Sequence, residues 1–404
     1  MTAMPTHQAA RALKIALVTE TYPPEVNGVA ATLARVVQGL RERGHHLQLV
    51  RPRQSPTDQP EPPSERWQET LVRGLPVPRY PELRMGLPAT RQLTRLWQAQ
   101  RPDVVHLVTE GPLGWSGLRA ARRLGLPVVS DFRTNFHAYT RHYGVGWLGR
   151  PMEAWLRHFH NRTDRTMVPT RRLAQELEAR GFERLSVIAR GVDAQRFNPV
   201  HRDNTLRHLW GAEDTTHVAL CVGRLAPEKN LDMVIDAWRS LQRRHPDTRL
   251  VLVGDGPDRA RLRQRCPEAV FAGTLRGDDL AKAYASADIF LFASMTETFG
   301  NVVAEAMASG LAVLAFDHAA AGELIQHGHN GLIAPLGQTE AFLNIASHLL
   351  DNHDRLRHMG RYARVTAQSL DWQRIVAGVE NEYHATLSSR VAAPADVSSL
   401  IQAH

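Results

Sequence analysis

The sequence has few of the features that mark secreted, metal-binding or membrane-spanning proteins. Only two cysteines, Cys221 and Cys266, occur in 404 residues. They form no CxxC pair, which argues against a disulfide framework or a thiolate metal site. No apolar run approaches the roughly 20 residues of a spanning helix, and residues 1–12 hold no signal-peptide core. GxGxxG is absent, so no dinucleotide site is indicated. We expect a cytoplasmic protein without a metal or cofactor.

Positive charge is present in excess and is unevenly distributed. Residues 1–200 hold 29 Lys and Arg against 17 Asp and Glu, nearly all of the cations being arginine, while the remainder holds 20 against 24. Such asymmetry favours an anionic partner for the first half. Nucleic acid, an anionic membrane surface and a phosphorylated acceptor are candidates. An arginine-rich composition without any partner explains the same counts.

The first half alternates apolar strands and amphipathic helices. An apolar run at 13–18 is followed by a turn ending in Asn27-Gly28, a helix with an apolar stripe, and a strand at 46–50. This is the opening of a Rossmann-like domain. After a Pro-rich loop at 52–64 we expect helices at 88–100 and 114–124 and strands at 104–108, 128–129, 166–168 and 185–188. The first domain is predicted to span residues 1–195.

A helix predicted from Arg141 to Arg165 mixes Trp147, Trp155 and Phe159 with arginines. Aromatic side chains beside basic ones suit a lipid surface, and a packed helix with a solvated basic face fits equally well.

The second half repeats the strand–glycine turn–helix plan, although no sequence repeat is visible. Strands are expected at 218–222, 250–253, 270–272, 288–292, 311–315 and 331–334, with helices at 338–351, 354–369 and 372–388. The second domain is predicted to span 200–370, after a linker that begins at Arg190. Residues 389–404 have the composition of a disordered tail.

Two acids mark the segment Ser294–Gly310, SMTETFGNVVAEAMASG. Glu297 lies in a loop, and Glu305 lies in the apolar run of the helix that begins near Gly300. A buried carboxylate needs partners, and Glu305 either lies on an exposed face, makes a structural ion pair, or binds a ligand. The loop ends at a helix N-terminus, which favours an anion, and Gly300 allows a ligand to approach the backbone.

This segment resembles the E-x7-E signature of the retaining glycosyltransferases of family 4, which have the GT-B fold. Glu297, Phe299, Gly300 and Glu305 match the signature directly, and Asn301 is the next residue of the same loop. The resemblance implies that Glu297 binds hydroxyls of the donor sugar and that Glu305 binds the ribose. It also implies two Rossmann-like, doubly wound parallel-sheet domains facing across a cleft, with helix 372–388 crossing back to the first domain. It covers roughly residues 13–388.

A basic pair follows the first strand of the second domain, in Gly223-Arg224-Leu-Ala-Pro-Glu-Lys229. A strand-to-helix turn with two cations suits a pyrophosphate, although two surface basic residues would give the same pattern. The resemblance assigns Arg224 and Lys229 to the nucleotide diphosphate. It places Gly254 near the nucleotide and Leu275 beside the base.

In the first domain the resemblance places Gly28 against the donor phosphates or sugar. The family usually has Phe-His-Thr where this chain has Phe132-Arg133-Thr134, so the usual catalytic histidine is not carried over. Arg133 is predicted to contact donor phosphates or sugar, with His137 nearby, or both residues are structural.

The resemblance implies a metal-independent transfer of a hexose, of mannose or glucose type, from a UDP- or GDP-sugar with retention of configuration. The basic half and the Trp/Arg helix favour a lipid acceptor at the inner face of the cytoplasmic membrane. A soluble or polysaccharide acceptor is the alternative within the class. A GT-B epimerase or phosphorylase would share the fold, and a nucleic-acid-binding protein would use the basic half, but no recognised binding module accompanies its dispersed arginines.

Overall fold

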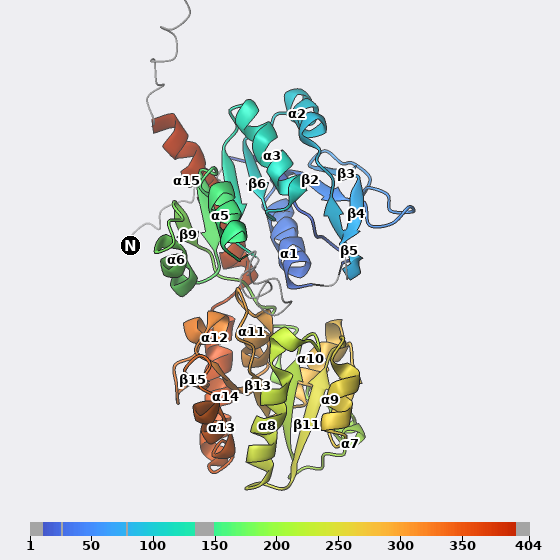
Figure 1. The fold of residues 1–404 in the computed structure, drawn as a ribbon, viewed down its shortest axis with the longest axis vertical. Coiled ribbons are helices and arrows are strands. Elements are labelled where there is room, and N and C mark those ends of the chain that lie inside the picture. The colour runs from blue at the N-terminus through green and yellow to red at the C-terminus, as the bar shows by residue number, and fades with distance from the viewer. Residues whose placement is uncertain (1–10, 26, 78–79, 134–148, 393–404) are drawn as a thin grey trace, which may run out of the picture.

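The computed structural model describes residues 11–25, 27–77, 80–133 and 149–392, which form two α/β units arranged one above the other (Figure 1). Each unit is built on one parallel sheet. Within the described residues, no helix combines the length and the apolar character that crossing a bilayer requires.

The N-terminal sheet has seven parallel strands in the order β3-β2-β1-β6-β7-β8-β9. Its strands are β1 (Lys14–Val18), β2 (His46–Pro52), β3 (Trp67–Val72), β6 (Val104–Leu107), β7 (Val128–Asp131), β8 (Arg165–Val168) and β9 (Leu185–Val187). Its helices are α1 (Gly28–Glu42), α2 (Thr90–Ala99), α3 (Pro112–Arg123), α5 (Gly149–His160) and α6 (Arg171–Glu178).

Strand β1 shows why the sheet is buried on both faces. Ile15 and Leu17 belong to the apolar cluster under α1, whereas Ala16 and Val18 belong to the cluster under α2 and α3. Alternate side chains of a strand point to opposite faces, so a strand covered by helices on both sides reads as one continuous apolar run. This is why the sequence run at 13–18 predicted the strand.

The C-terminal sheet has six parallel strands in the order β12-β11-β10-β13-β14-β15. Its strands are β10 (His217–Val222), β11 (Thr248–Val253), β12 (Val270–Gly273), β13 (Ile289–Phe292), β14 (Ala312–Phe316) and β15 (Leu332–Ala334). Its helices are α7 (Asn204–Leu209), α8 (Leu231–Gln242), α9 (Arg259–Arg265), α10 (Gly277–Ala285), α11 (Asn301–Ala308), α12 (Ala319–Leu324), α13 (Thr339–Ser347) and α14 (His353–Gln368). Numbered from its first strand, the order is that of a doubly wound Rossmann sheet.

The last helix, α15 (Trp372–Ala392), lies against the N-terminal unit, where it is drawn in red (Figure 1). Val376 packs so closely on Gly39 of α1 that a Cβ at Gly39 would lie 2.6 Å from a Val376 methyl carbon. The hydroxyl of Tyr383 lies 2.8 Å from Nδ1 of the buried His106. The chain therefore closes its first unit with its last helix.

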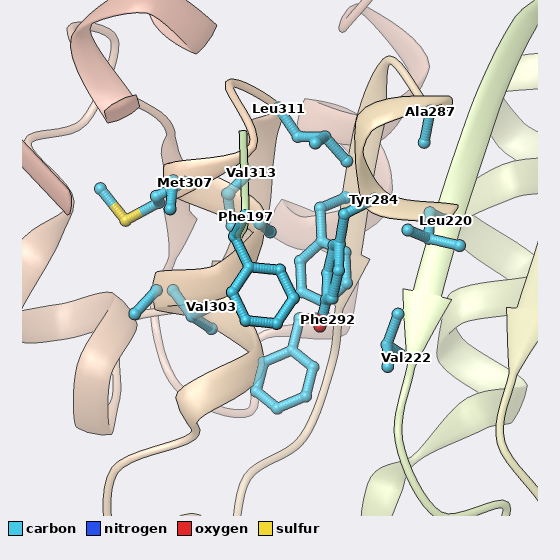
Figure 2. Packing of buried hydrophobic residues seen from close by; sticks show 14 of the residues in the cluster. Phe197, Leu220, Val222, Tyr284, Ala287, Phe292, Val303, Met307, Leu311 and Val313 are labelled. Atoms are coloured by element: carbon cyan, nitrogen blue, oxygen red, sulfur yellow. The ribbon is translucent and has the colours of Figure 1, made fainter. Parts of the chain in front are cut away.

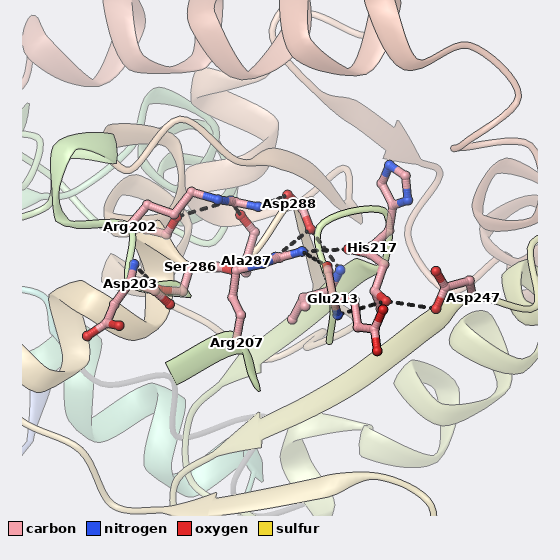
Figure 3. Close-up of polar contacts among 12 residues, drawn as sticks. Arg202, Asp203, Arg207, Glu213, His217, Asp247, Ser286, Ala287 and Asp288 are labelled. Carbon is pink, nitrogen blue, oxygen red and sulfur yellow. Dashed lines mark hydrogen bonds and ion pairs between the residues drawn. The ribbon is translucent and has the colours of Figure 1, made fainter. Parts of the chain in front are cut away.

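A buried arginine holds the start of β13 against the beginning of the second unit (Figure 3). Arg207 is 3% exposed and donates to the carbonyl oxygens of Thr216 at 2.6 Å and Ser286 at 2.9 Å. Its guanidinium also lies 3.1 Å from the Asp288 carboxylate, which accepts from Arg202 at 2.9 Å. Because Asp288 immediately precedes β13, this network fixes the strand that carries the Glu297 loop.

Three strands were not predicted, and the ends of two helices were predicted wrongly. Strand β3 and the antiparallel hairpin of β4 (Gly74–Val77) and β5 (Tyr80–Gly86) were not predicted. The middle of β3 is half-buried on both faces, so its sequence does not alternate. The helix expected to reach Arg165 ends at His160, where the Thr163 hydroxyl donates to the His160 carbonyl at 2.8 Å. Residues 389–392, expected in a tail, are helical.

Candidate active site

The predicted site residues of the second unit lie where its strand order reverses. Strands β10 and β13 are neighbours, and the connections that leave them run to opposite sides of the sheet. The loop after β10 carries Gly223, Arg224 and Lys229, and the loop after β13 carries Glu297. Such a switch point, at the carboxyl ends of the strands, is the usual ligand position in doubly wound sheets.

An ion pair between Lys229 Nζ and a Glu297 carboxylate oxygen joins the two loops. Ser294 donates its hydroxyl to the same carboxylate at 2.8 Å, and His318 Nε2 donates to the Glu297 carbonyl at 3.0 Å. Burial opposes ionisation of Glu297, but the Lys229 charge and these side-chain hydrogen bonds outweigh it and lower the pKa of the carboxyl. Glu297 is therefore ionised and fixed in place at neutral pH.

The second cation of this loop is also paired. Arg224 contacts the carboxylate of Glu228, which is 3% exposed. The Glu228 carbonyl accepts from the Thr296 hydroxyl at 3.3 Å, which ties the β10 loop to the β13 loop a second time. Arg224 and Lys229, whose side chains are 33% and 23% exposed, both lie on the β10 loop, which these contacts hold against the β13 loop.

Glu305 lies one helical turn into α11, half-buried, with an oxygen that accepts from the Tyr284 hydroxyl at 2.9 Å. Burial raises the pKa of Glu305 to about 7, and the bond from Tyr284 offsets only part of that rise. Val303 and Met307 anchor the other side of α11 in the core beside Tyr284 and Phe292 (Figure 2). The helix is thus packed as a rigid support for its half-buried N-terminal end.

Two glycines at this edge are required by the backbone. Gly300 precedes α11 at φ +87°, in the left-handed region, where a side chain is costly. A Cβ on Gly254, at φ +132°, would lie 1.9 Å from the Gly223 carbonyl oxygen. The loops after β10 and β11 therefore touch through bare backbone.

The remaining predicted residues lie either in the apolar core of the second unit or at the boundary where the two units meet. Phe299 is buried at 1% exposure, and the half-buried Leu275 packs on the same apolar cluster. The Asn301 amide is 3.4 Å from the Thr32 hydroxyl, and a Cβ on Gly28 would lie 3.6 Å from the same amide nitrogen. The first loop of the N-terminal unit therefore meets the N-terminus of α11.

Arg133 lies on the N-terminal side of this boundary, directed toward its own loop. Its Nε donates to Asp131 at 2.6 Å, and its carbonyl accepts from the Thr298 hydroxyl, two residues before Gly300, at 3.1 Å. His137 lies outside the described residues. The sequence did not indicate the partners Ser294, His318, Tyr284 and Asp131. Ser294 and Asp131 lie close in the chain to Glu297 and Arg133, whereas Tyr284 and His318 lie 21 positions from Glu305 and Glu297.

Two facing Rossmann-like units with a nucleotide-type site in the second define the GT-B class. The structure matches HepE of Anabaena in complex with UDP and glucose with a TM-score of 0.72, at 19% identity, over 92% of this chain and 100% of that one. This likeness shows the fold.

Two family models match the chain, Glycosyltransferase Family 4 over residues 26–196 and Glycosyl transferases group 1 over residues 216–352. A GDP-mannose-dependent alpha-mannosyltransferase of Mycobacterium tuberculosis is 38% identical over 94% of this chain and 98% of its own. An alpha-monoglucosyldiacylglycerol synthase of Streptococcus pneumoniae is 27% identical over 75% and 71%. The chain belongs to glycosyltransferase family 4. It is a hexosyltransferase that takes its sugar from a nucleotide-diphosphate donor.

Proposed function

We propose that this enzyme transfers mannose from GDP-mannose to a hydroxyl group of a lipid acceptor at an anionic membrane surface, with retention of configuration and without a metal ion. The observation that carries the proposal is the Lys229–Glu297 ion pair. It brings the two sequence motifs together at one switch point, next to the amides that begin α11.

In this mechanism the charges of Arg224 and Lys229 stabilise the diphosphate as it leaves. The acceptor oxygen forms a bond to the anomeric carbon, the bond from that carbon to the diphosphate oxygen breaks, and the acceptor proton passes to a diphosphate oxygen. Cations aimed at a group that gains charge supply the transition-state stabilisation otherwise given by a metal. Glu297 orients the sugar hydroxyls, and Glu305 accepts hydrogen bonds from the ribose.

The donor is inferred from the relatives and not from the site. The Mycobacterium tuberculosis relative is named for GDP-mannose, whereas HepE was solved with UDP and glucose. Only the first relative is close enough in sequence for its donor to be a reasonable guide. The base lies beside Leu275, where backbone contacts give no readable preference. GDP-mannose is therefore the donor to test first.

The acceptor is assigned to the N-terminal domain, residues 1–195 together with α15, and the donor to the C-terminal domain, residues 200–370. One exposed surface of the first domain suits an anionic membrane. There the rings of Trp115 and Trp155 are tilted by 52° with their centroids 4.7 Å apart, and the guanidinium of Arg162 lies 6.0 Å from the Trp115 ring centroid. Exposed Arg119, Arg122 and Arg123 flank them. Basic and aromatic side chains together favour an anionic interface.

Thermal unfolding with a donor panel tests this function. A ligand at about 100 times its Kd stabilises the native state by about 2.7 kcal/mol, so the preferred donor is expected to raise Tm by several degrees. GDP-mannose and GDP are expected to give the largest shifts, with UDP-glucose and UDP as comparisons. The exposed-charge variant Arg357→Gln is the control and is expected to behave like wild type. Equal, negligible shifts for every nucleotide would contradict the proposal.

A further inference from the structure

Two arginine side chains are buried together on the N-terminal side of the domain boundary. Arg133 follows β7, and its side chain is 8% exposed. Arg190 follows β9 and is 7% exposed. Both line one small cavity, together with Thr32 and Asp131. Arginines are seldom buried to this degree without matching carboxylates.

The positive charge in this cavity exceeds the negative charge in contact with it. Asp131 accepts from Arg133 and lies 3.1 Å from His106 Nε2. Burial opposes its ionisation, but the charges of Arg133 and His106 prevail and hold the pKa of Asp131 well below its ordinary value. Burial first, and the nearby Arg133 second, lower the pKa of Arg190 to about 9. Arg190 is still a cation at neutral pH. Asp131 and the more distant Glu297 both attract it, but Glu297 is already paired with Lys229, which leaves Asp131 as the carboxylate that lines the cavity with the two guanidinium groups.

The cavity also contains an unsatisfied donor. Within the described part of the chain, Nη1 of Arg133 is buried without a hydrogen-bond partner. A buried donor on a charged group is costly to leave unpaired. The cavity volume of about 30 Å³ holds roughly two water molecules. That space suits a carboxylate or part of a phosphate, and it is too small for a sugar ring.

We propose that Arg133 and Arg190 form a subsite for an anionic group, a carboxylate or a phosphate, on the acceptor. The inference rests on the proposed function, because it takes the acceptor to bind the N-terminal domain. A planar guanidinium binds either group through paired hydrogen bonds, and the net positive charge draws the anion into a position that a neutral acceptor cannot use.

Contacts across the boundary place this subsite beside the donor loop. The Arg133 carbonyl accepts from the Thr298 hydroxyl at 3.1 Å, and the Arg190 guanidinium carbon lies 6.0 Å from the Phe299 ring centroid. Thr298 and Phe299 directly follow Glu297, the residue proposed to hold the donor sugar. The donor diphosphate already has two cations of its own, Arg224 and Lys229, on the other domain. We therefore assign the subsite to the acceptor.

Three matched probes test the subsite: methyl α-glucopyranoside, its 6-carboxylate and its 6-phosphate, titrated by calorimetry with and without saturating GDP. Hydrogen bonds to charged groups contribute about 1.5–3 kcal/mol. At least one charged probe is therefore expected to bind roughly tenfold or more tightly than the neutral glycoside. The charged probe that binds more tightly shows whether the anionic group of the acceptor is a carboxylate or a phosphate. Equal affinity for all three probes would overturn the subsite.

Variants separate charge recognition from folding. Arg190→Gln is expected to abolish the preference for the charged probes while leaving GDP affinity within about twofold, and Arg190→Lys to keep part of it. Arg95→Gln, which removes an exposed charge of α2 in the same domain, is the matched control and is expected to keep all of it. Circular dichroism and Tm verify that each variant is folded.

A full preference retained in folded Arg190→Gln contradicts the subsite. A wild-type protein that prefers the charged probes but does not bind GDP instead contradicts the proposed function, so the two failures are distinguishable.

Discussion

The two domains have the same strand order around their switch points but opposite chemistry there. In the N-terminal domain the helix after the fourth strand of the Rossmann order is α3, and Glu20 caps it. The Glu20 carboxylate accepts from the Leu113 amide at 2.8 Å and from the amide of Gly86 in the hairpin. In the C-terminal domain the corresponding helix is α11, which begins after Gly300, a residue with no side chain to cap it.

The comparison supports the proposal that the donor nucleotide binds to the C-terminal domain and not to the N-terminal one. A helix N-terminus at a switch point attracts an anion, and in α3 that anion is supplied by the chain. Burial raises the pKa of Glu20 to about 7 in spite of its bonds to backbone amides, and a carboxyl group fills the position in either protonation state. The N-terminus of α11 instead follows the Glu297 loop. There Lys229 is paired with Glu297 and Arg224 with Glu228, and we propose that these two cations also contact the donor diphosphate. The N-terminus of the corresponding helix is therefore capped by Glu20 in the N-terminal domain, whereas in the C-terminal domain it follows a glycine that has no side chain to cap it.

The largest expected effect comes from removing Lys229, the cation that pairs with Glu297 beside the N-terminus of α11. Lys229→Met is expected to lower kcat/KM for transfer by about 10²-fold or more, the scale seen for single charge-stabilising groups. Glu297→Ala is expected to cost a similar factor. Because the two side chains form one ion pair, the double variant should lose much less than the product of the single losses. Steady-state kinetics with the preferred donor measure all three.

The matched control for this prediction is Arg357→Gln, which removes an exposed charge of α14 in the same domain. It is expected to retain wild-type turnover. Wild-type kinetics in Lys229→Met would show that the diphosphate does not bind beside Lys229 at the N-terminus of α11.

An intermediate effect concerns the two carboxyl groups with pKa values of about 7, one in each domain. Only ionised Glu305 accepts two ribose hydrogen bonds, and its pKa of about 7 makes about one molecule in ten competent at about pH 6. The Kd for GDP is therefore expected to be roughly tenfold weaker at about pH 6 than at about pH 8. GDP titrates in the same range, so the measured quantity is the difference between wild type and Glu305→Gln by calorimetry.

Glu305→Gln should remove this part of the pH dependence and weaken binding at about pH 8. Glu20→Gln is the matched control, since Glu20 also has a pKa of about 7 but caps α3 in the other domain. It should keep the wild-type profile. The same flattening in both variants would show that the dependence reports general stability and not ribose binding.

The sequence predicted what is local and missed what is paired over long distances. The buried strands were visible as apolar runs, and Gly300 marked the start of α11, because both depend on a few neighbouring residues. The contact of Lys229 with Glu297 joins residues 68 positions apart. The resemblance to a known family implied that both residues bind the same donor, but their direct contact was not predicted. Asp131 stands two residues before Arg133, but Arg190 lies in the predicted linker, so the convergence of these residues at one cavity became visible only when β7 and β9 were placed in one sheet.

The smallest expected effect concerns the outer surface of the N-terminal domain, which has no counterpart assigned in the C-terminal one. Each arginine near an anionic bilayer contributes about 1 kcal/mol, or roughly fivefold in affinity. Arg119→Gln and Arg122→Gln, both exposed on α3 beside Trp115, are therefore each expected to weaken binding to phosphatidylserine-containing vesicles by that factor at low salt. Co-sedimentation at two salt concentrations measures it, with Arg357→Gln as control. Since we propose that the donor binds to the other domain, both variants should keep the wild-type Kd for GDP. Unchanged vesicle binding in both would move the membrane contact to another surface or favour a soluble acceptor.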